Sequence, residues 1–523
     1  MDEPLAPGES HEGLARGYRE QGVWLAERLT DHVRRWASTK PAEVAVVDES
    51  ERLAWSELWR RAAATADALR ELGVTRGDVV STQLPNGASM VVLHLAIELA
   101  GAIHNPLAIQ FREHELEQVS RLLGTRLTIH PGLHRGEDYG AIHARTPLGR
   151  AGKALSVESV LRSPRGAFAE ARTPPVDPSG VAFILNTSGT VSMKGVAHSH
   201  EESLFSARTV GGLVGLGAGD VVLCAIPMTW GGGLCWGVRL ALHAGATLVS
   251  MERWEARPAV ERIEREGVTF TYGPPTILGD LVALAPEWRP RGRLTMICTA
   301  APIPRDLCAS AREKLGMNPV PGYGQTEHLH STLGRLDDPF EKLTQTDGCL
   351  LPGVELRAVD REGRSCPPGS PGGLLCRGPN VALGYYRQEE LTRQTFRPDG
   401  WQVTQDVGTF DADGYLRVVG RERDLIIRGG LNVSPTEVEQ LLAKHPDVRE
   451  VAVVGYADPR YGERICAFIV PRGSAVPTVE ELSAALREMG VARYKHPERV
   501  EISDSLPLTV TGKLRREELR RRL

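Results

Sequence analysis

Strand-like apolar segments alternate with helix-like segments along the first 300 residues of the chain. A helical pattern at 58–72 precedes an apolar segment at 79–84, and a second helical pattern at 113–123 precedes another at 127–130. This alternation is typical of a doubly wound α/β fold with largely parallel strands. Ligands bind beyond the carboxyl ends of such strands, so we expect the binding site there.

The sequence changes in character after about residue 350. Between 350 and 422 the strand-like segments are short and interrupted by Gly and Pro, which indicates a β-barrel-like subdomain. The segment that follows has helix and strand patterns over about 100 residues, an ordinary domain size. We therefore predict an α/β protein with a large N-terminal domain at 1–422, made of doubly wound mixed sheets plus the barrel-like part, and a small α+β C-terminal domain at 423–523.

The composition disfavours several classes of function. A formal net charge of −4 over 523 residues gives no basis for binding a polyanion, so we expect no nucleic-acid partner. The eight cysteines form no C-x-x-C pair, which suits free thiols in a reducing compartment. The N-terminus lacks the pattern of a signal peptide, and the most apolar stretch, 90–109, contains His94 and Glu98. We expect a cytoplasmic protein without a membrane span.

The stretch at 183–200 has the composition of a phosphate-binding loop. An apolar run leads into small polar residues and a lysine, namely Thr187, Ser188, Gly189, Thr190 and Lys194. Hydroxyl groups, loop N–H groups and a positive charge are donors that bind phosphate, and glycine permits close backbone approach. The common P-loop pattern is absent. The alternative is a polar surface loop that contains a lysine by chance.

Further motifs follow in order along the chain. They are Gly322-Tyr323-Gly324-Gln325-Thr326-Glu327, Trp401 with Thr404-Gln405-Asp406, Gly420-Arg421-Glu422-Arg423-Asp424, and Pro507-x-Thr509-x-Thr511-Gly512-Lys513. Together with the loop at 187–195, they make residues 25–523 resemble the adenylate-forming (ANL) superfamily, which includes acyl-CoA synthetases, adenylation domains of peptide synthetases and luciferases. The resemblance is to the acyl-CoA synthetase and aryl-acid CoA ligase type.

The resemblance implies a reaction in two halves. A carboxylate attacks the α-phosphate of ATP to give acyl-AMP and pyrophosphate, and a thiol then displaces AMP. Mg²⁺ is the expected cofactor with Glu327 as its ligand, and ATP and CoA are co-substrates. Lys513 is expected to stabilise the first transition state, with Glu327 and Thr326 as the other catalytic residues. The residues that the resemblance assigns to ATP are Thr187, Ser188, Gly189, Thr190, Lys194, Ala300, Ala301, Gly322, Tyr323, Gly324, Asp406 and Arg421.

Each of these residues has a structural explanation when it is taken alone. Asp406 can cap a loop, and Arg421 can form a surface ion pair. Glu327 can be a charge near a helix start, and Lys513 can be a solvated lysine near a frayed end. The order of the motifs along the chain favours the functional interpretation.

The sequence departs from the family pattern in three places. The phosphate loop is one residue shorter than T-S-G-T-T-G-x-P-K-G and lacks its middle glycine and its proline. Weak ATP binding, or a catalytically weak nucleotide-binding relative, is therefore an alternative to an active ligase. Gln405 stands where the motif has glycine, and Trp230 stands where many relatives have histidine. The bulky Trp230 is expected to narrow or flatten the acyl pocket.

The expected acyl pocket combines a flat aromatic residue with glycines, which suits a ring better than a long chain. Its candidate residues are Trp230, Gly231, Gly232, Thr299 and His328, together with the residues that follow His328 as far as Thr332. The opening Tyr18-Arg19-x-x-Gly22-x-Trp24 also resembles members that activate aryl acids. We favour an aromatic or cyclic carboxylic acid as the small-molecule partner and keep medium-chain acids as an alternative. The sequence leaves a monomer and a homodimer equally open.

The thiol acceptor is expected to be free CoA. The resemblance places a hinge at Arg423, about which the mobile small domain swings between the half-reactions, and it places Gly429 and Gly430 on the CoA side. No carrier-protein segment follows Lys513 in the sequence. Loading of a separate carrier protein is the alternative.

Overall fold

The structure is a computed structural model that describes residues 7–162, 177–188, 193–301, 303–421, 424–428, 431–458, 461–489, 491, 493–509 and 514–523. Contacts within the chain divide it into two units. The first comprises Met1–Leu356 and Cys376–Val403, and the second comprises Arg357–Leu375 and Thr404–Leu523. The domain boundary that the sequence suggested at residue 422 stays a prediction.

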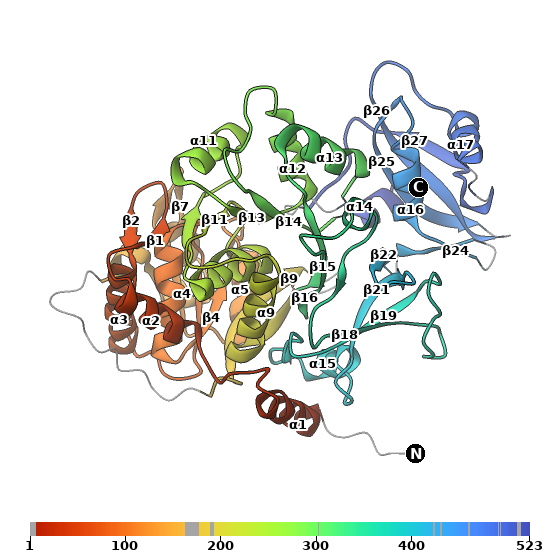
Figure 1. The fold of residues 1–523 in the computed structure, drawn as a ribbon. Helices are drawn as coiled ribbons and strands as arrows, with labels where there is room; N and C mark the ends of the chain where they lie inside the picture. The colour runs from red at the N-terminus through yellow and green to blue at the C-terminus, as the bar shows by residue number, and fades with distance from the viewer. Residues whose placement is uncertain are drawn as a thin grey trace. The chain divides into compact units, whose positions relative to one another are not determined.

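The first unit contains a nine-stranded sheet with a parallel centre (Figure 1). Six neighbouring strands pair in parallel, and antiparallel strands complete both edges. The predicted α/β fold with mixed sheets is thereby confirmed. From one edge to the other, the strands are β17 (Cys349–Leu350), β16 (Leu329–Leu333), β15 (Val320–Gln325), β14 (Thr295–Cys298), β13 (Phe270–Gly273), β11 (Val221–Cys224), β12 (Thr247–Ser250), β1 (Val44–Val47) and β2 (Arg52–Ala54).

A seven-stranded sheet forms the second layer of strands in the first unit. Its parallel part ends at a long antiparallel hairpin of β9 and β10, and β20 pairs with β10 from a distant part of the sequence. In order, the strands are β20 (Gly384–Tyr385), β10 (Met193–Ser199), β9 (Val181–Ser188), β4 (Ile103–Pro106), β3 (Val79–Thr82), β5 (Leu127–His130) and β8 (Ala154–Ser156). The short strands β6 (Leu133–His134) and β7 (Glu137–Asp138) pair separately.

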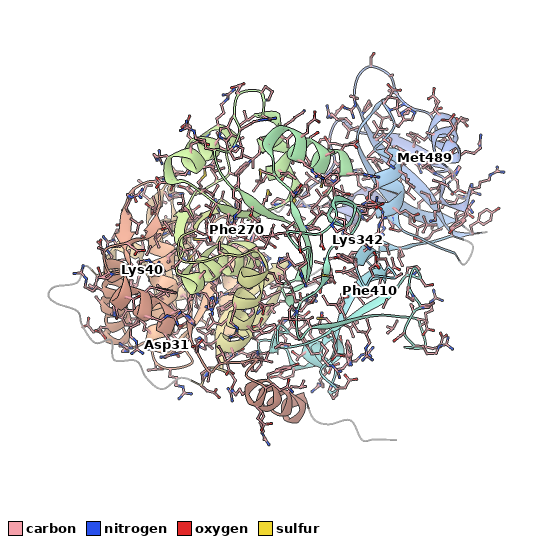
Figure 2. The ribbon with its side chains drawn as sticks, in the orientation of Figure 1. Asp31, Lys40, Phe270, Lys342, Phe410 and Met489 are labelled. Carbon is pink, nitrogen blue, oxygen red and sulfur yellow. The ribbon has the colours of Figure 1, made fainter. Side chains whose placement is uncertain are left out.

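Helices join and cover the strands of the first unit (Figure 1). Figure 2 shows the dense side chains of this unit, where Phe270 on β13 is 1% exposed. The helices are α1 (Pro7–Glu20), α2 (Leu29–Thr39), α3 (Trp55–Glu71), α4 (Ala88–Ala100), α5 (Glu113–Leu123), α6 (Tyr139–Ala144), α7 (Pro147–Arg150), α8 (Val157–Val160), α9 (His200–Leu213), α10 (Leu240–Ala244), α11 (Ala256–Glu266), α12 (Pro275–Ala283), α13 (Arg305–Ser310), α14 (Phe340–Gln345), α15 (Glu389–Thr395), and the π-helices η1 (Gly232–Arg239) and η2 (Ala311–Leu315).

Helix α5 shows how local sequence sets an element. Leu116, Val119 and Leu123 recur at helical spacing and are buried on one face, in the same apolar cluster as Ile184 of β9. Gly124 ends the helix in a left-handed conformation (φ 64°) that glycine adopts without a Cβ penalty. The predicted helix at 113–123 is therefore confirmed with its bounds.

The π-helix η1 was not predicted from the sequence. It packs closely on the loop and strand before it, because a Cβ on Gly233 would lie 2.2 Å from the Pro227 carbonyl oxygen and one on Gly237 would lie 2.5 Å from the Cys224 sulfur. Long π-helical turns are rare and are often found at functional sites. This one begins at Gly232, a residue of the predicted acyl pocket.

A buried ionic network joins α4, α9 and η1. The Glu98 carboxylate accepts a hydrogen bond from the Thr30 amide (2.8 Å), and it lies 3.4 Å from the His200 ring and 3.6 Å from the Arg239 guanidinium. Arg239 also donates to the Ser203 hydroxyl (2.9 Å) and is fully buried. Burial alone would raise the pKa of Glu98, but His200 and then Arg239 lower it well below its ordinary value, so the carboxylate is charged.

The second unit contains two sheets. A four-stranded sheet lies in the region predicted to be barrel-like, in the order β18 (Glu355–Val359), β19 (Gly372–Arg377), β21 (Gln402–Phe410) and β22 (Leu416–Arg421). The other sheet has the order β24 (Leu431–Val433), β23 (Ile426–Arg428), β26 (Gly462–Pro471) and β25 (Val448–Asp458), with β27 (Arg499–Ile502) also paired to β26. Helices α16 (Pro435–Leu442) and α17 (Val479–Glu488) pack on it, and α18 (Arg516–Arg520) contacts β25. This is the α+β arrangement that was predicted.

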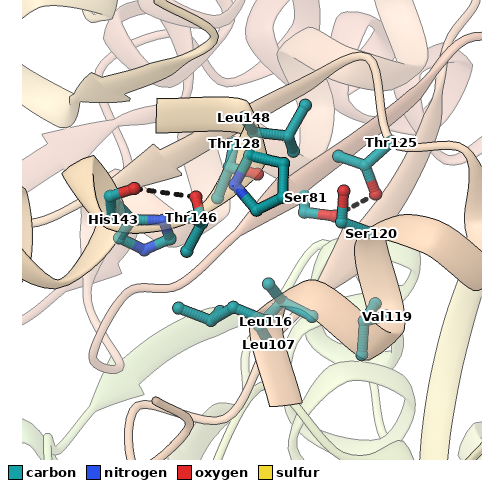
Figure 3. A pocket seen from close by; sticks show the side chains of 11 residues that line it. Ser81, Leu107, Leu116, Val119, Ser120, Thr125, Thr128, His143, Thr146 and Leu148 are labelled. Carbon is teal, nitrogen blue, oxygen red and sulfur yellow. Dashed lines mark hydrogen bonds between the residues drawn. The ribbon is translucent and has the colours of Figure 1, made fainter. Parts of the chain in front are cut away.

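A small cavity in the first unit has no role at the predicted site. A cavity of about 10 Å³ lies between Ser81, Thr125, His143 and Thr146, and Figure 3 shows their hydrogen bonds. That volume is about the smallest that holds one water molecule, so no substrate fits there.

None of the helices within the described ranges combines the length and apolar character that crossing a membrane requires.

Candidate active site

The predicted phosphate loop is the turn of the β9–β10 hairpin. Thr187 pairs with Lys194, and Ser188 pairs with Met193, so the hairpin holds both ends of the loop. Gly189 and Thr190 lie outside the described residues. The Gln388 side chain binds β10 next to the loop, since it accepts from the Gly195 amide and donates to the Met193 carbonyl, both at 3.3 Å.

Lys194 and Glu327 meet at Tyr385, a residue that sequence reasoning missed. The Tyr385 hydroxyl donates to Glu327 Oε1 at 2.8 Å, and Lys194 Nζ donates to the same hydroxyl at 3.4 Å. The ammonium also lies 4.9 Å from the centre of the Tyr385 ring, within cation–π range. Burial, and then the Glu327 charge, raise the pKa of Tyr385, so the phenol stays protonated. The only sequence signal was its place in Gly384-Tyr385-Tyr386, whose pairing with β10 is long-range.

The Tyr323 to Glu327 motif forms the end of β15 and the turn into β16. Gly324 is required there, because a Cβ would lie 1.7 Å from the Leu329 carbonyl oxygen. Tyr323 is 7% exposed, and its ring centre lies 5.4 Å from that of His328. Thr326 and Glu327 are half-buried in the turn. The strand pairing thus places Glu327 beyond the carboxyl end of a parallel strand, as expected.

The segment after β14 carries backbone strain. Ala300 has a φ of 72°, a left-handed conformation that costs a residue with a Cβ about 1–2 kcal/mol. Ala300 and Ala301 are exposed beyond the strand end. Strain of this kind clusters at ligand sites, and both residues were assigned to ATP from the sequence.

Aromatic rings gather beside the predicted acyl-pocket residues. The Thr299 hydroxyl donates to the Gly322 carbonyl at 2.9 Å. Close by lie Trp236 on η1, Tyr272 on β13 and His330 on β16, with the Trp236 and His330 ring centres 4.6 Å apart. Trp236 and Tyr272 were not singled out from the sequence, and His330 was included only within the range that ended at Thr332.

The other predicted acyl-pocket residues are divided between half-buried and buried positions. Trp230 and Gly231 are half-buried, and a Cβ on Gly231 would meet only Leu185, at 3.6 Å. His328 is fully buried, and its Nδ1 bonds the Ser331 hydroxyl at 2.8 Å. Burial lowers the pKa of His328 to about 3, so its ring is neutral.

Asp406 and Arg421 form a pair within the second unit. They face each other across β21 and β22, with Arg421 Nε 3.3 Å from Asp406 Oδ1. Asp406 is 6% exposed. The preceding Gln405 has a φ of 59°, which explains why the family motif has glycine there. Arg423, Gly429, Gly430 and Lys513 lie outside the described residues.

Comparison with known proteins identifies the family. The model described as "AMP-binding enzyme" matches residues 33–386, and "AMP-binding enzyme C-terminal domain" matches residues 437–513. The chain belongs to this family of adenylate-forming enzymes, as its motifs predicted. It is 30% identical to the medium-chain fatty-acid–CoA ligase of Escherichia coli (strain K12), and the alignment covers 96% of this chain and 92% of that protein. It is 33% identical to a salicylyl-CoA synthase / salicylate adenylyltransferase of a Streptomyces species, and that alignment covers 96% of this chain and 95% of that protein.

A solved structure supports the same assignment. The anthranilate CoA ligase AuaEII in complex with anthranoyl-AMP superposes with a TM-score of 0.84 at 26% identity, covering 95% of this chain and 97% of that one. Similarity therefore extends over both units of the chain.

Proposed function

We propose that the protein is an ATP-dependent carboxylic acid–CoA ligase. The acid displaces pyrophosphate from the α-phosphorus of ATP to give acyl-AMP. The CoA thiol, after loss of its proton, then attacks the acyl carbon, and the bond to AMP breaks. The observation that carries the proposal is the junction of Lys194, Tyr385 and Glu327, which brings a phosphate-binding cation and a metal-binding carboxylate together beside the β9–β10 loop.

In this proposal the nucleotide is bound by the residues that the family motifs assign to it. Lys194 and the loop donors at Thr187 to Thr190 neutralise the phosphates. Ala300, Ala301 and Tyr323 border the base, and Asp406 and Arg421 bind the ribose. Mg²⁺ suits Glu327, since this ion takes one or two carboxylates together with phosphate oxygens, and when bound it offsets phosphate charge. The Tyr385 hydrogen bond to Oε1 leaves Oε2 of Glu327 available as a ligand.

Tyr385→Phe is expected to weaken the apparent Mg²⁺ affinity about 10-fold, because groups that orient a metal ligand typically affect affinity by about 10- to 100-fold. The hydroxyl that fixes the Glu327 carboxylate is lost, while the ring beneath Lys194 remains. Mn²⁺ binding in the presence of ATP, followed by electron paramagnetic resonance, measures the effect. Tyr386→Phe is the matched control, since that ring packs in an apolar cluster. Equal metal affinity in both variants would remove Tyr385 from the site.

Two of the three relatives compared above, the salicylyl-CoA synthase and the anthranilate CoA ligase, are named for aromatic acids. They favour an aromatic or cyclic acid as the substrate. The stacked rings of Trp236, which is buried, and Tyr272, which is half-buried, support the same class. CoA is the proposed acceptor, and loading of a carrier protein is the outcome to be distinguished from it.

We also propose a cytoplasmic location, which the eight free cysteines support. Whether the protein acts as a monomer or a homodimer stays open within the proposal.

Exchange of labelled pyrophosphate into ATP tests the first half-reaction without any acceptor. We expect exchange that depends on an acid from a panel of aryl, alicyclic and fatty acids. ATP binding without exchange for any acid would contradict the proposal and would favour a catalytically weak nucleotide-binding relative with a shortened loop.

Arg423→Pro tests the proposed domain alternation. A rigid residue at the hinge is expected to preserve acyl-AMP formation and to slow thioester formation about 10-fold or more, because only the second half-reaction then lacks its domain arrangement. Single-turnover assays of the two half-reactions measure this difference. Equal rates for the variant and the unaltered protein in both assays would refute the hinge assignment.

A further inference from the structure

Within the described residues, neither ring nitrogen of His330 has a hydrogen-bond partner in good geometry, although the Thr332 and Tyr323 backbones lie close to the ring. His330 is 1% exposed. Burial lowers the pKa of His330 to about 4, and weak backbone hydrogen bonds of Thr332 and Tyr323, too poorly aligned to satisfy the ring nitrogens, offset this only in part. The ring is therefore neutral at pH 7, with one N–H donor and one acceptor. A buried polar group with both positions unused is unfavourable unless another molecule bonds it.

The His330 ring lies in an aromatic cluster built by three separate elements. Its centre is 4.6 Å from that of Trp236 on η1, with the planes tilted by 52°, and 5.8 Å from that of Tyr272 on β13, nearly edge-on at 73°. Trp236 and Tyr272 are themselves stacked, with centres 6.1 Å apart. Flat walls of this kind suit an aromatic ring.

Glycines place this cluster directly against the proposed acid site. A Cβ on Gly322 would lie 2.8 Å from His330 Cε1 and 3.0 Å from Nδ1, so the polar edge of the ring meets a bare Cα. A Cβ on Gly232 would lie 3.2 Å from Tyr272 Cε1. The Thr299 hydroxyl holds the Gly322 carbonyl at 2.9 Å. His330 therefore packs on Gly322, whose carbonyl binds Thr299, and its neighbour Tyr272 lies next to Gly232.

We propose that His330 hydrogen-bonds a hydroxyl or amino group carried on the ring of the acid. The substrate class is then a hydroxy- or amino-substituted aromatic carboxylic acid, and the inference rests on the proposed function. A neutral imidazole can accept from such a group and can donate to it. A fatty acid or an unsubstituted ring would leave both nitrogens unpaired, and sites built to hydrogen-bond a substrate discriminate strongly against analogues that lack the group.

The test compares kcat/KM for acid-dependent pyrophosphate release across matched acids. The panel is benzoate, its 2-, 3- and 4-hydroxy derivatives, 2-aminobenzoate, cyclohexanecarboxylate and octanoate. We expect at least one hydroxy or amino acid to exceed benzoate by about 100-fold. In His330→Phe, which keeps a flat ring without nitrogens, this ratio is expected to fall to within about 3-fold. His330→Gln retains a donor and an acceptor and is expected to restore part of the preference.

The outcomes separate the inference from the proposed function. Activation of some acid with no preference for hydroxy or amino groups, or with a preference that His330→Phe retains, would overturn the inference alone and leave His330 bonded by ordered water only. Release of no pyrophosphate with any acid would overturn the proposed function and this inference with it. Tryptophan fluorescence and thermal unfolding check that each variant is folded. Should His330→Phe fail this check, His330→Leu, which also lacks both nitrogens, replaces it, and a ratio equal to that of the unaltered protein counts against the inference.

Discussion

Glu98→Ala is expected to lower the free energy of unfolding of the first unit by about 3–5 kcal/mol, the usual cost of removing one partner from a buried ion pair. The substitution leaves the Arg239 guanidinium fully buried without its carboxylate, and it also removes the acceptor for the Thr30 amide. Contacts with Ser203 and His94 remain but carry no negative charge. The network connects α4 to η1, so the loss affects the element that carries Trp236.

Urea unfolding followed by tryptophan fluorescence measures this loss. All nine tryptophans belong to the first unit, so the signal reports that unit alone. Glu117→Ala is the control, because Glu117 pairs with Arg121 on the surface of α5, where 44% and 79% of the two side chains are exposed. That change is expected to cost less than about 0.5 kcal/mol. A cost below about 1 kcal/mol for Glu98→Ala would show that the network does not hold these elements together.

Lys513→Ala is expected to slow acyl-AMP formation by about 10²- to 10³-fold, the range for losing one group that stabilises developing charge. The family resemblance implies that its ammonium bridges the attacking carboxylate and the ribose 5′ oxygen as charge develops on the α-phosphate, and we propose the same role here. Thioester formation from pre-formed acyl-AMP does not use this contact and is expected to be retained. The two rates, measured separately, show whether the effect is confined to the first half-reaction.

Arg515→Ala controls for a change of charge in the same segment. Arg515 is exposed, and its nearest carboxylate, on Glu518, is 4.0 Å away. The control is expected to keep both rates within about 2-fold, as surface ion pairs contribute little. Equal slowing of both half-reactions in Lys513→Ala would contradict a role specific to adenylation.

Local patterns predicted the elements that local forces determine. The apolar face of helix α5, its bounds and its terminal glycine are all encoded within 12 consecutive residues. The strand before the phosphate loop and the alternation of strands with helices were predicted for the same reason. The Tyr323 to Glu327 motif was recognised by its resemblance to the family, and the pairing of β9 with β10 was not predicted. The π-helix η1 was not found, because its winding depends on the close approach of Gly233 and Gly237 to Pro227 and Cys224, which a helical period does not encode.

Long-range pairing explains the site residues that were missed. Tyr385 reaches Glu327 and Lys194 only because β20 pairs with β10, which lies almost 190 positions earlier in the chain. Trp236, Tyr272 and His330 come from three elements and meet only after the sheet has formed. Gln405 stands where the family motif has glycine, and its left-handed φ shows what the usual glycine provides at that position.

The most direct test of the account incubates the protein with ATP, Mg²⁺, CoA and the acid panel and identifies the products by mass spectrometry. The account predicts an acyl-CoA formed from a hydroxy- or amino-substituted aromatic acid, together with AMP and pyrophosphate. Acyl-AMP that accumulates without any acyl-CoA would contradict CoA as the acceptor and would indicate a carrier protein. ATP that remains intact with every acid would contradict the assignment as a ligase.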